Sequence, residues 1–339
     1  MKRWLPILIG LIITALALVL AFQNTDFAAV LAAMRAIKPG WAVAGLAAVA
    51  ISASTRGARW SLLLEGRLKL VDAFWLWTLG FLFNNVLPFK LGEVARAVLA
   101  GRRPGMSFGA ALSSVVVERL FDMVAVVMLV GIAIVSQPLP DWAKQAGAVM
   151  GVGALGALVA LAVAARNPQG ALTLGSQLIG WVPRMGSERA RALLAPFVEG
   201  LGGVRDWRTF AGGFGMTLVA WVASIAAMWI MMMVFWDSVP LKDAVLALSA
   251  AGLGVTVPSA PSSVGPYEAA VIAVLTAIQY DRATTQAFAV VAHAAIFVVT
   301  SALGLIGLLR EGVSFGQIAR EAQDVRSHAP EGEAGKIRS

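Results

Sequence analysis

Apolar residues along this chain gather in long unbroken runs instead of the one-face pattern of helices on a soluble protein. About 20 helical residues cross the hydrocarbon of a bilayer, so runs of this length predict membrane-spanning helices. We expect six spans, at about residues 5–22, 41–54, 108–135, 146–165, 210–236 and 283–309.

Two further apolar segments are interrupted before they reach spanning length. Each carries Pro-x-x-x-Gly followed by a glutamate: Pro88 to Gly92 with Glu93, and Pro261 to Gly265 with Glu268. Broken apolar segments at matching positions in two halves of a chain point to a transport site near the bilayer midplane. We therefore expect two re-entrant helical hairpins, which enter and leave on one side of the membrane, with turns at 88–96 and 258–268.

Composition places the chain in a membrane. Hydrophobic residues make up 59% of the sequence, and the mean hydropathy is +0.79. A soluble globule would have to expose much of this apolar surface to water. The sequence has no cysteine and only two histidines, His293 and His328. We therefore expect no metal site, and we find no Gly-x-x-x-x-Gly-Lys-Ser/Thr motif and expect no cofactor.

Basic residues predict the orientation. If both termini are cytoplasmic and the hairpins do not cross, most of the 27 lysines and arginines fall on the inner side. This is the asymmetry of the positive-inside rule. The net charge of +8 then requires no nucleic-acid partner, because anionic lipid headgroups face the basic side. The residues left outside are Arg35, Lys38, Lys144, Lys242 and Arg282.

The same topology predicts an internal repeat. Residues 1–310 form one membrane domain, with one unit over about 1–136 and a second over about 144–310. Each unit holds three crossings and one hairpin, and an odd number of crossings inverts the second unit. We expect the region from Arg166 to Arg208 to be an amphipathic connector. The polar residues 311–339 are expected to be a largely disordered cytoplasmic tail.

The first hairpin carries polar side chains at its turn. Irregular backbone at this depth must be buried in protein or line a wet cavity. The polar groups then either form an interfacial pair that closes the turn or take part in a site for a substrate headgroup. The residues are Asn84, Asn85, Lys90, Glu93 and Arg96.

The third predicted span contains Glu118, Arg119 and Asp122 within an apolar run. A charge at a helix centre costs about 2.5–3.5 kcal/mol on insertion scales, so three charges indicate a shared polar interior. They form either an internal ion-pair lock with Arg56 or Arg59, or a transport-linked site that holds a coupling proton. The two alternatives are compatible.

The second hairpin offers hydroxyls on Ser262 and Ser263, followed by Tyr267 and Glu268 at the start of a helix. The free amides of that helix N-terminus favour an anion. Glu268 is the competing occupant, because its carboxylate can cap the same amides. We interpret His293 as a hydrogen-bonded packing residue, with a proton carrier as the alternative.

These motifs together resemble the membrane region of lysylphosphatidylglycerol synthetases, a family also called flippase-like membrane proteins. The resemblance rests on Asn84-Asn85-x-Leu87-Pro88-x-Lys90-x-Gly92-Glu93-x-x-Arg96, on Glu118-Arg119-x-x-Asp122, and on Pro258-x-x-Pro261-x-x-x-Gly265-x-x-Glu268, and it covers about residues 5–310. It implies an inner-membrane protein that moves a lipid or lipid-linked headgroup between leaflets. Two departures are Lys90, where the family more often has arginine, and Ser262-Ser263, where glycines are common. The aminoacyl-transferase domain of the synthetases has no counterpart here, so we expect no lipid aminoacylation.

The sequence therefore predicts an all-α protein of the bacterial inner membrane that translocates a phospholipid or lipid-linked substrate. We expect its headgroup phosphate to contact Arg56, Arg59, Lys90 and Arg96, with hairpin movement at Pro88, Gly92, Pro258, Pro261 and Gly265. One alternative is a membrane scaffold for a separate lipid-modifying enzyme. A second is an intramembrane hydrolase or transferase that uses Glu93, Glu118 and Asp122 as acid and base. We expect no enzymatic activity.

Overall fold

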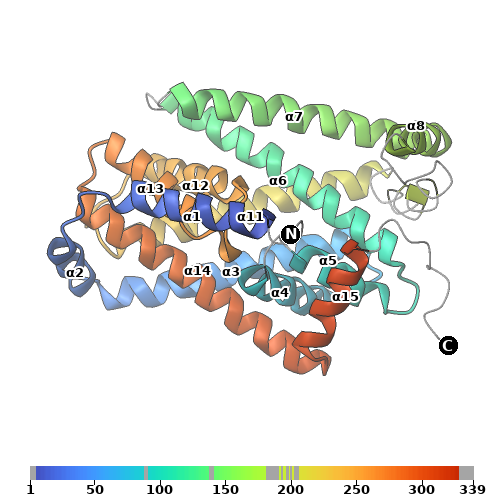
Figure 1. Ribbon diagram of the computed structural model, residues 1–339, viewed down its shortest axis with the longest axis horizontal. Coiled ribbons are helices and arrows are strands. Elements are labelled where there is room, and N and C mark those ends of the chain that lie inside the picture. The colour runs from blue at the N-terminus through green and yellow to red at the C-terminus, as the bar shows by residue number, and fades with distance from the viewer. Residues whose placement is uncertain are drawn as a thin grey trace.

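The computed structural model describes residues 5–87, 91–136, 141–180 and 206–327, together with Arg191, Leu194, Ala195, Val198 and Leu201. Every regular element within these residues is a helix (Figure 1). The helices are α1 (Leu5–Phe22), α2 (Phe27–Arg35), α3 (Pro39–Leu63), α4 (Leu70–Val86), α5 (Leu91–Gly101), α6 (Phe108–Ser136), α7 (Asp141–Arg166), α8 (Pro168–Gly180), α11 (Trp207–Met233), α12 (Leu241–Thr256), η2 (Pro261–Ser263), α13 (Pro266–Ala277), α14 (Arg282–Glu311) and α15 (Phe315–Ser327).

Helix length and composition confirm an all-helical membrane protein. Among the described residues, α11 and α14 are long and apolar enough to cross a bilayer. The bent pair α1 and α2, which meet at 84°, makes a third crossing if it is counted as one span. Helices α3 and α6 have 25 and 29 residues, which is also enough length at 1.5 Å per residue. Their interiors, however, contain the charged residues described below.

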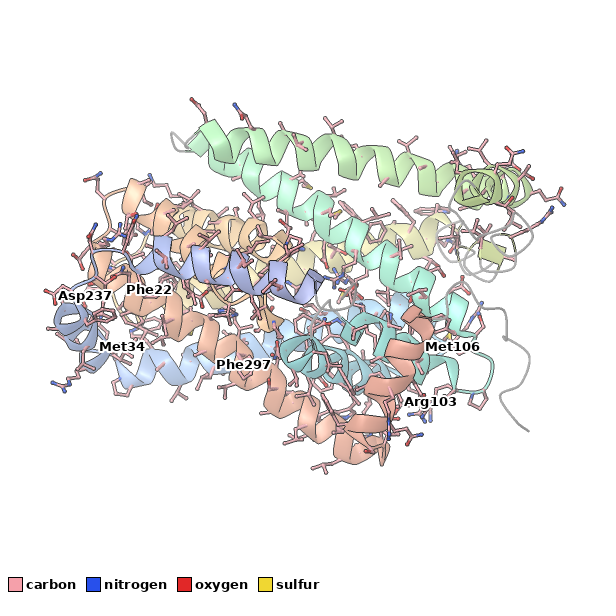
Figure 2. The ribbon with its side chains drawn as sticks, viewed as in Figure 1. Phe22, Met34, Arg103, Met106, Asp237 and Phe297 are labelled. Carbon is pink, nitrogen blue, oxygen red and sulfur yellow. The ribbon has the colours of Figure 1, made fainter. Side chains whose placement is uncertain are left out.

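The long helices run roughly parallel to the long axis of the molecule (Figure 1). Helix α7 lies along one side against α6, and α14 runs diagonally to α15. In Figure 2, Met34 and Asp237 lie at one end of the molecule and Arg103 and Met106 at the other. One end therefore holds α2 and the α11–α12 loop, and the other holds the α5–α6 loop.

Helix ends follow local capping chemistry. The side chain of Asp26 accepts hydrogen bonds from the amides of Ala28 and Ala29 at the start of α2, and Asp281 accepts one from Thr284 at the start of α14. Such caps satisfy amides that have no partner inside the helix. Helix α14 ends at Gly312, whose φ of 63° is the left-handed conformation that favours glycine.

Each broken segment folds as a pair of packed helices, α4 with α5 and α12 with α13. Both pairs approach through a glycine. A Cβ on Gly92 would lie 1.8 Å from the carbonyl oxygen of Gly80, and a Cβ on Gly254 would lie 2.5 Å from that of Pro266. In sequence both contacts join residues twelve positions apart. The two helices of each hairpin therefore come closest at matching sequence positions.

The packing of the two halves is reciprocal. Helix α4 packs on α14 and α12 packs on α6, while α5 packs on α6 and α13 packs on α14. Helices α3 and α11 pair with each other in the most extensive contact of the fold. The outer helices break this pattern, because α1 packs on α13 and α7 packs on α6.

Helix α15 lies within the predicted tail and was not expected from the sequence. It packs on α5, where the side chain of Ile318 is fully buried and the ring of Phe315 stacks on Phe83 at 4.5 Å. An ion pair joins Arg102 to Glu321, and Arg103 pairs with Glu311 at 2.6 Å. Residues 328–339 and most of the 181–205 connector lie outside the described residues.

The glycine crossing makes a testable prediction for the first hairpin. Gly92→Ala places a methyl group against the backbone of Gly80, so we expect a loss of about 1–3 kcal/mol in stability, seen as a lower Tm in detergent. Gly40→Ala is the matched control, because Gly40 is also the second residue of its helix and its Cβ would meet open space. Equal melting temperatures for the two variants would contradict the packing.

Candidate functional site

Three helices bring charged side chains together inside the protein, and a fourth adds polar partners. We call this group the arginine–carboxylate cluster. Helix α3 supplies two arginines, α5 an arginine and a glutamate, and α6 two carboxylates and an arginine, while α11 adds uncharged hydrogen-bonding groups. The charged members are Arg56, Arg59, Glu93, Arg96, Glu118, Arg119 and Asp122.

Arg59 is the central cation of the cluster. Its Nη1 donates to Oδ1 of Asp122 at 2.5 Å, and its Nη2 donates to Oδ2 at 3.2 Å. Its Nη2 also lies 3.0 Å from Oε1 of Glu118. Both Arg59 and Glu118 are fully buried. Two-pronged contacts of this kind are the strongest geometry for an arginine–carboxylate pair.

Glu118 contacts two more arginines. It pairs with Arg96 at 3.1 Å and with Arg119 at 2.7 Å. The guanidinium group of Arg96 also lies 4.9 Å from the ring centre of Trp60, and the indole of Trp77 donates to Glu118 at 3.4 Å. Several cations and an indole therefore surround one buried carboxylate.

Arg56 and Arg119 lie toward the edge of the cluster. Arg56 donates to the hydroxyl of Ser224 at 3.0 Å and lies 3.8 Å from Asp122. Arg119 lies 3.4 Å from Asp122 and 3.5 Å from Glu93. The side chain of Arg119 is 36% exposed, against 0% for Arg59.

This geometry separates the roles that the sequence left open. The internal ion-pair lock between α3 and α6 is present, through Arg59. Arg59 and Arg96 are nearly inaccessible and are bound to carboxylates, so Arg56 and Arg119 are the more accessible arginines of the cluster. Glu118 contacts three arginines, which makes it a poor place for a coupling proton.

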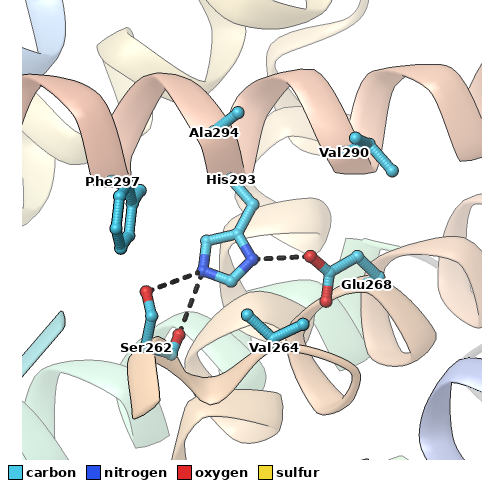
Figure 3. Close-up of a pocket in the computed structure, with 7 residues that line it drawn as sticks. All are labelled: Ser262, Val264, Glu268, Val290, His293, Ala294 and Phe297. Carbon is cyan, nitrogen blue, oxygen red and sulfur yellow. Dashed lines mark hydrogen bonds and ion pairs between the residues drawn. The ribbon is translucent and has the colours of Figure 1, made fainter. Parts of the chain in front are cut away.

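A second group of polar residues lies around His293 on α14, and we call it the Glu268–His293 site (Figure 3). Nδ1 of His293 lies 2.6 Å from Oε1 of Glu268, and Nε2 lies 3.0 Å from the carbonyl oxygen of Ser262. The ring stacks on Tyr267 with the centres 4.3 Å apart. Beside the site is a pocket of about 270 Å³, with walls formed mainly by apolar side chains.

Glu268 also settles the alternatives at the start of α13. Its Oε2 accepts a hydrogen bond from the amide of Gly265 at 2.7 Å, so it caps its own helix. A bound anion at this N-terminus would meet that carboxylate. The structure therefore favours the self-cap over the anion site.

The turn of the second hairpin has an unusual backbone. Ser262, Ser263 and Gly265 have φ values of 61°, 62° and 94°, in the left-handed region that favours glycine. Thr14 of α1 braces this turn, because its hydroxyl accepts from the amide of Ala260 at 2.9 Å and donates to the carbonyl of Val264 at 3.2 Å.

The two hairpin turns meet. At the end of α4, the amide of Asn85 donates to Thr300 at 3.0 Å and to Ser301 at 2.9 Å, and its oxygen accepts from Ser262 at 3.5 Å. The neighbouring Asn84 closes its own hairpin by accepting from the amide of Gly92 at 2.8 Å.

Other predicted residues contribute less or cannot be placed. Pro258 and Pro261 lie in and next to the second turn. Pro88 and Lys90 lie outside the described residues. Within the described part of the chain, no group of three or more His, Asp or Glu side chains is placed to hold a metal ion.

The two polar groups occupy equivalent places in the two halves. Glu93 opens α5 and Glu118 lies in α6, and Glu268 opens α13 and His293 lies in α14. Both pairs are separated by 25 residues. The first half thus has arginine-bound carboxylates where the second has a carboxylate–histidine pair.

Several supporting residues were missed by sequence reasoning. The indole of Trp221 donates to Asp122 at 3.0 Å, and Thr217 and Ser224 of α11 contact Arg59 and Arg56. The available signal was tryptophan inside an apolar helix, because a buried indole N–H usually finds an acceptor. Nothing in the sequence pattern marked Thr14.

The fold and these clusters define an all-helical membrane protein with charged groups buried between its helices. Residues 7–304 match the family described as the lysylphosphatidylglycerol synthase transmembrane region, and the chain belongs to that family.

Among curated proteins, the chain is similar to glycosyltransferase AglD of Haloferax volcanii. The two are 25% identical over 367 residues, which covers 97% of this chain but only 58% of the relative. No solved structure is significantly similar to the chain. These similarities associate the protein with membrane lipid-related functions.

The cluster predicts the effect of removing one buried charge. Glu118→Gln leaves Arg59 and Arg96 with fewer anionic partners in a low-dielectric interior, so we expect a loss of about 3–5 kcal/mol. Tm and the yield of monodisperse protein measure this loss. Glu65→Gln is the control, because the Glu65–Arg67 pair is exposed and is worth at most about 1 kcal/mol. Wild-type behaviour of Glu118→Gln would show that these charges do not support the fold.

Proposed function

We propose that the protein translocates an amphipathic lipid between the two leaflets of a membrane. The observation that carries this proposal is the meeting of two broken helical hairpins, through Asn85 and Ser262, within an apolar helical body that also buries a charged cluster. Broken helices that meet inside a membrane domain are the arrangement of transport sites. Ionisable residues inside membrane segments are rare and usually mark substrate or ion pathways, which supports a transport role.

The proposed topology has six crossings, made by α1, α3, α6, α7, α11 and α14, with the α4–α5 and α12–α13 hairpins re-entrant. The reciprocal packing of α3–α6 and α11–α14 supports two units of opposite orientation. Both termini are then cytoplasmic. The end with Arg103 is the inner one, and the end with Asp237 is the outer one (Figure 2).

The proposed substrate is a phospholipid or a lipid-linked molecule with an anionic headgroup. Within the described residues, the cluster has four arginines and three carboxylates, which leaves one net positive charge. Arg119 and Arg56 then contact the phosphate while the acyl chains remain in the bilayer. Family membership supports a lipid, and the name of the Haloferax volcanii relative supports a lipid-linked sugar as one class.

We propose transport without catalysis. Glu93, Glu118 and Asp122, which the enzymatic alternative requires as acid and base, each contact at least one arginine. Carboxylates held in this way are poorly suited to transferring protons. The scaffold alternative predicts that lipid translocation by the purified protein is absent.

Translocation can be measured in vesicles that contain the purified protein and a fluorescent phosphatidylglycerol, by adding a quencher to one side. We expect the protein to move the probe and Arg119→Gln to slow it by about tenfold, the effect of losing roughly 1.4 kcal/mol of charge-assisted contact. Arg67→Gln is the control, because Arg67 is exposed and far from the cluster in the α3–α4 loop. Rates equal to those of protein-free vesicles would overturn the proposed function.

The topology has its own test, since the chain contains no cysteine. We expect Asp237→Cys to react with a membrane-impermeant maleimide added outside intact cells, because its side chain is almost fully exposed. Arg67→Cys should react only after the membrane is opened. External labelling at position 67 would contradict the two-unit arrangement.

A further inference from the structure

The contacts of His293 determine where its protons are. Nε2 lies 3.0 Å from the carbonyl oxygen of Ser262, which can only accept a hydrogen bond, and 3.4 Å from the hydroxyl of the same residue, which can donate or accept (Figure 3). The carbonyl oxygen is the closer of the two, so we assign Nε2 a hydrogen that it donates to this oxygen. A neutral imidazole has only one N–H, so Nδ1 of a neutral ring would have only a lone pair.

The second ring nitrogen also faces an acceptor. Nδ1 lies 2.6 Å from Oε1 of Glu268, a distance that requires a hydrogen between the two atoms. Either the imidazole is a cation beside a carboxylate, or the carboxyl group is protonated beside a neutral imidazole. Both arrangements hold one proton more than a neutral histidine beside a carboxylate.

Glu268 and Ser262 connect this proton to the hairpin turn. Oε2 of Glu268 accepts from the amide of Gly265 at 2.7 Å, and Ser262 lies at the tip of the same turn. Loss of the shared proton leaves one hydrogen for the two ring nitrogens. A lone pair then faces either the Glu268 carboxylate at Nδ1 or the Ser262 carbonyl at Nε2, where the only remaining donor is the Ser262 hydroxyl at 3.4 Å. The contact that holds the turn on α14 would then open.

Few other groups influence this proton. On α13, the ring of Tyr267 stacks on the imidazole, and the turn itself contributes the uncharged Ser262. Helix α4 presents the uncharged Asn85 and α1 presents Thr14 to the turn. Helix α3 meets α14 through apolar packing that includes Val49. Among the described contacts, Glu268 is the only carboxylate paired with the ring.

The pocket opens beside this site at the surface of the helical body. It is lined by Ser262, Glu268 and His293 together with apolar side chains, and two of its lining residues, Val264 and Phe297, are 38% exposed. The polar pair thus lies at the edge of the protein interior instead of being sealed inside it.

We propose that Glu268 and His293 form a binding site for one coupling proton, whose release frees the turn of the second hairpin from α14. The proton moves between the shared site and solvent, and no other bond changes. Because Ser262 also contacts Asn85, movement of this turn reaches the first hairpin. This inference rests on the proposed function, since it supplies the ion that drives lipid movement.

Spin-label distances test the site without relying on transport. We would label Val264→Cys on the turn and Val298→Cys on α14, which are both exposed, and measure distances in nanodiscs from pH 5 to pH 10. We expect a single short distance at low pH and a second, longer distance that grows as pH rises. A distance distribution that does not change between pH 5 and pH 10 would overturn the proposal.

Glu268→Gln is the decisive variant. Its amide can donate to Nδ1 and its oxygen can accept from Gly265, so it keeps both contacts without a removable proton. We expect the short distance at every pH. His328→Gln is the matched control, because it removes the only other histidine in the chain and should leave the pH response of the wild type. A pH response in Glu268→Gln equal to that of the wild type would overturn the proposal.

If Glu268→Gln fails to fold, ¹⁵N shifts of the imidazole in the His328→Gln protein report on His293 alone. If the ring is the cation, we expect both nitrogens to be of the N–H type at low pH and one to lose its hydrogen at high pH. If the carboxyl group holds the proton, we expect the Nδ1 shift to change as its lone pair loses that hydrogen-bond donor. Shifts that do not change from pH 5 to pH 10 would overturn the site. If the protein translocates lipid at a rate that does not depend on a pH gradient, the proton coupling is overturned and the proposed function stands. If the distances depend on pH but no lipid is translocated, the proton site is supported and the proposed function is overturned.

Discussion

The fold depends on giving buried charged groups and broken backbone protein partners where water is absent. A charge at the centre of a membrane helix is unfavourable unless protein groups replace its contacts with water. The same holds for backbone that leaves the helical conformation within the membrane. Arg59 shows how this is done, because it contacts two carboxylates and a threonine from two other helices. Helices α3, α6 and α11 are therefore held together by electrostatics as well as by apolar packing. Removing the charge of Arg59 therefore affects all three helices.

The same requirement explains the construction of the hairpins. Asn84 replaces the missing helical partner of the Gly92 amide, and Thr14 does the same for two backbone groups of the second turn. Each hairpin is closed by a side chain from its own arms, Asn84 in the first and Glu268 in the second. The described turn of the second hairpin is also held by α1 and α14, through Thr14 and His293. The left-handed serines of that turn add backbone strain in the same place.

The sequence predicted the class of fold, the two broken segments and the residues that gather in each cluster, because apolar runs, prolines and intramembrane charges are local signals. It did not predict which of these side chains contact one another. Nothing local shows that Arg59 pairs with both Glu118 and Asp122, or that Trp221 supports the latter. Helix α15 was missed because a charged, amphipathic segment after a membrane domain looks the same as a tail until its docking surface on α5 is known.

The two clusters differ in the kind of charge that they hold. The first is built on arginine, which stays protonated throughout the physiological range, so its ion pairs form a fixed framework and an electrostatic attraction for an anion. The second, at the equivalent place in the other half, is built on a histidine and a glutamate, side chains whose charge can change with pH. Under the proposed function the two halves therefore have different tasks. The permanent charges attract the anionic headgroup, and the proposed proton site couples its movement to a proton gradient, which sets the direction.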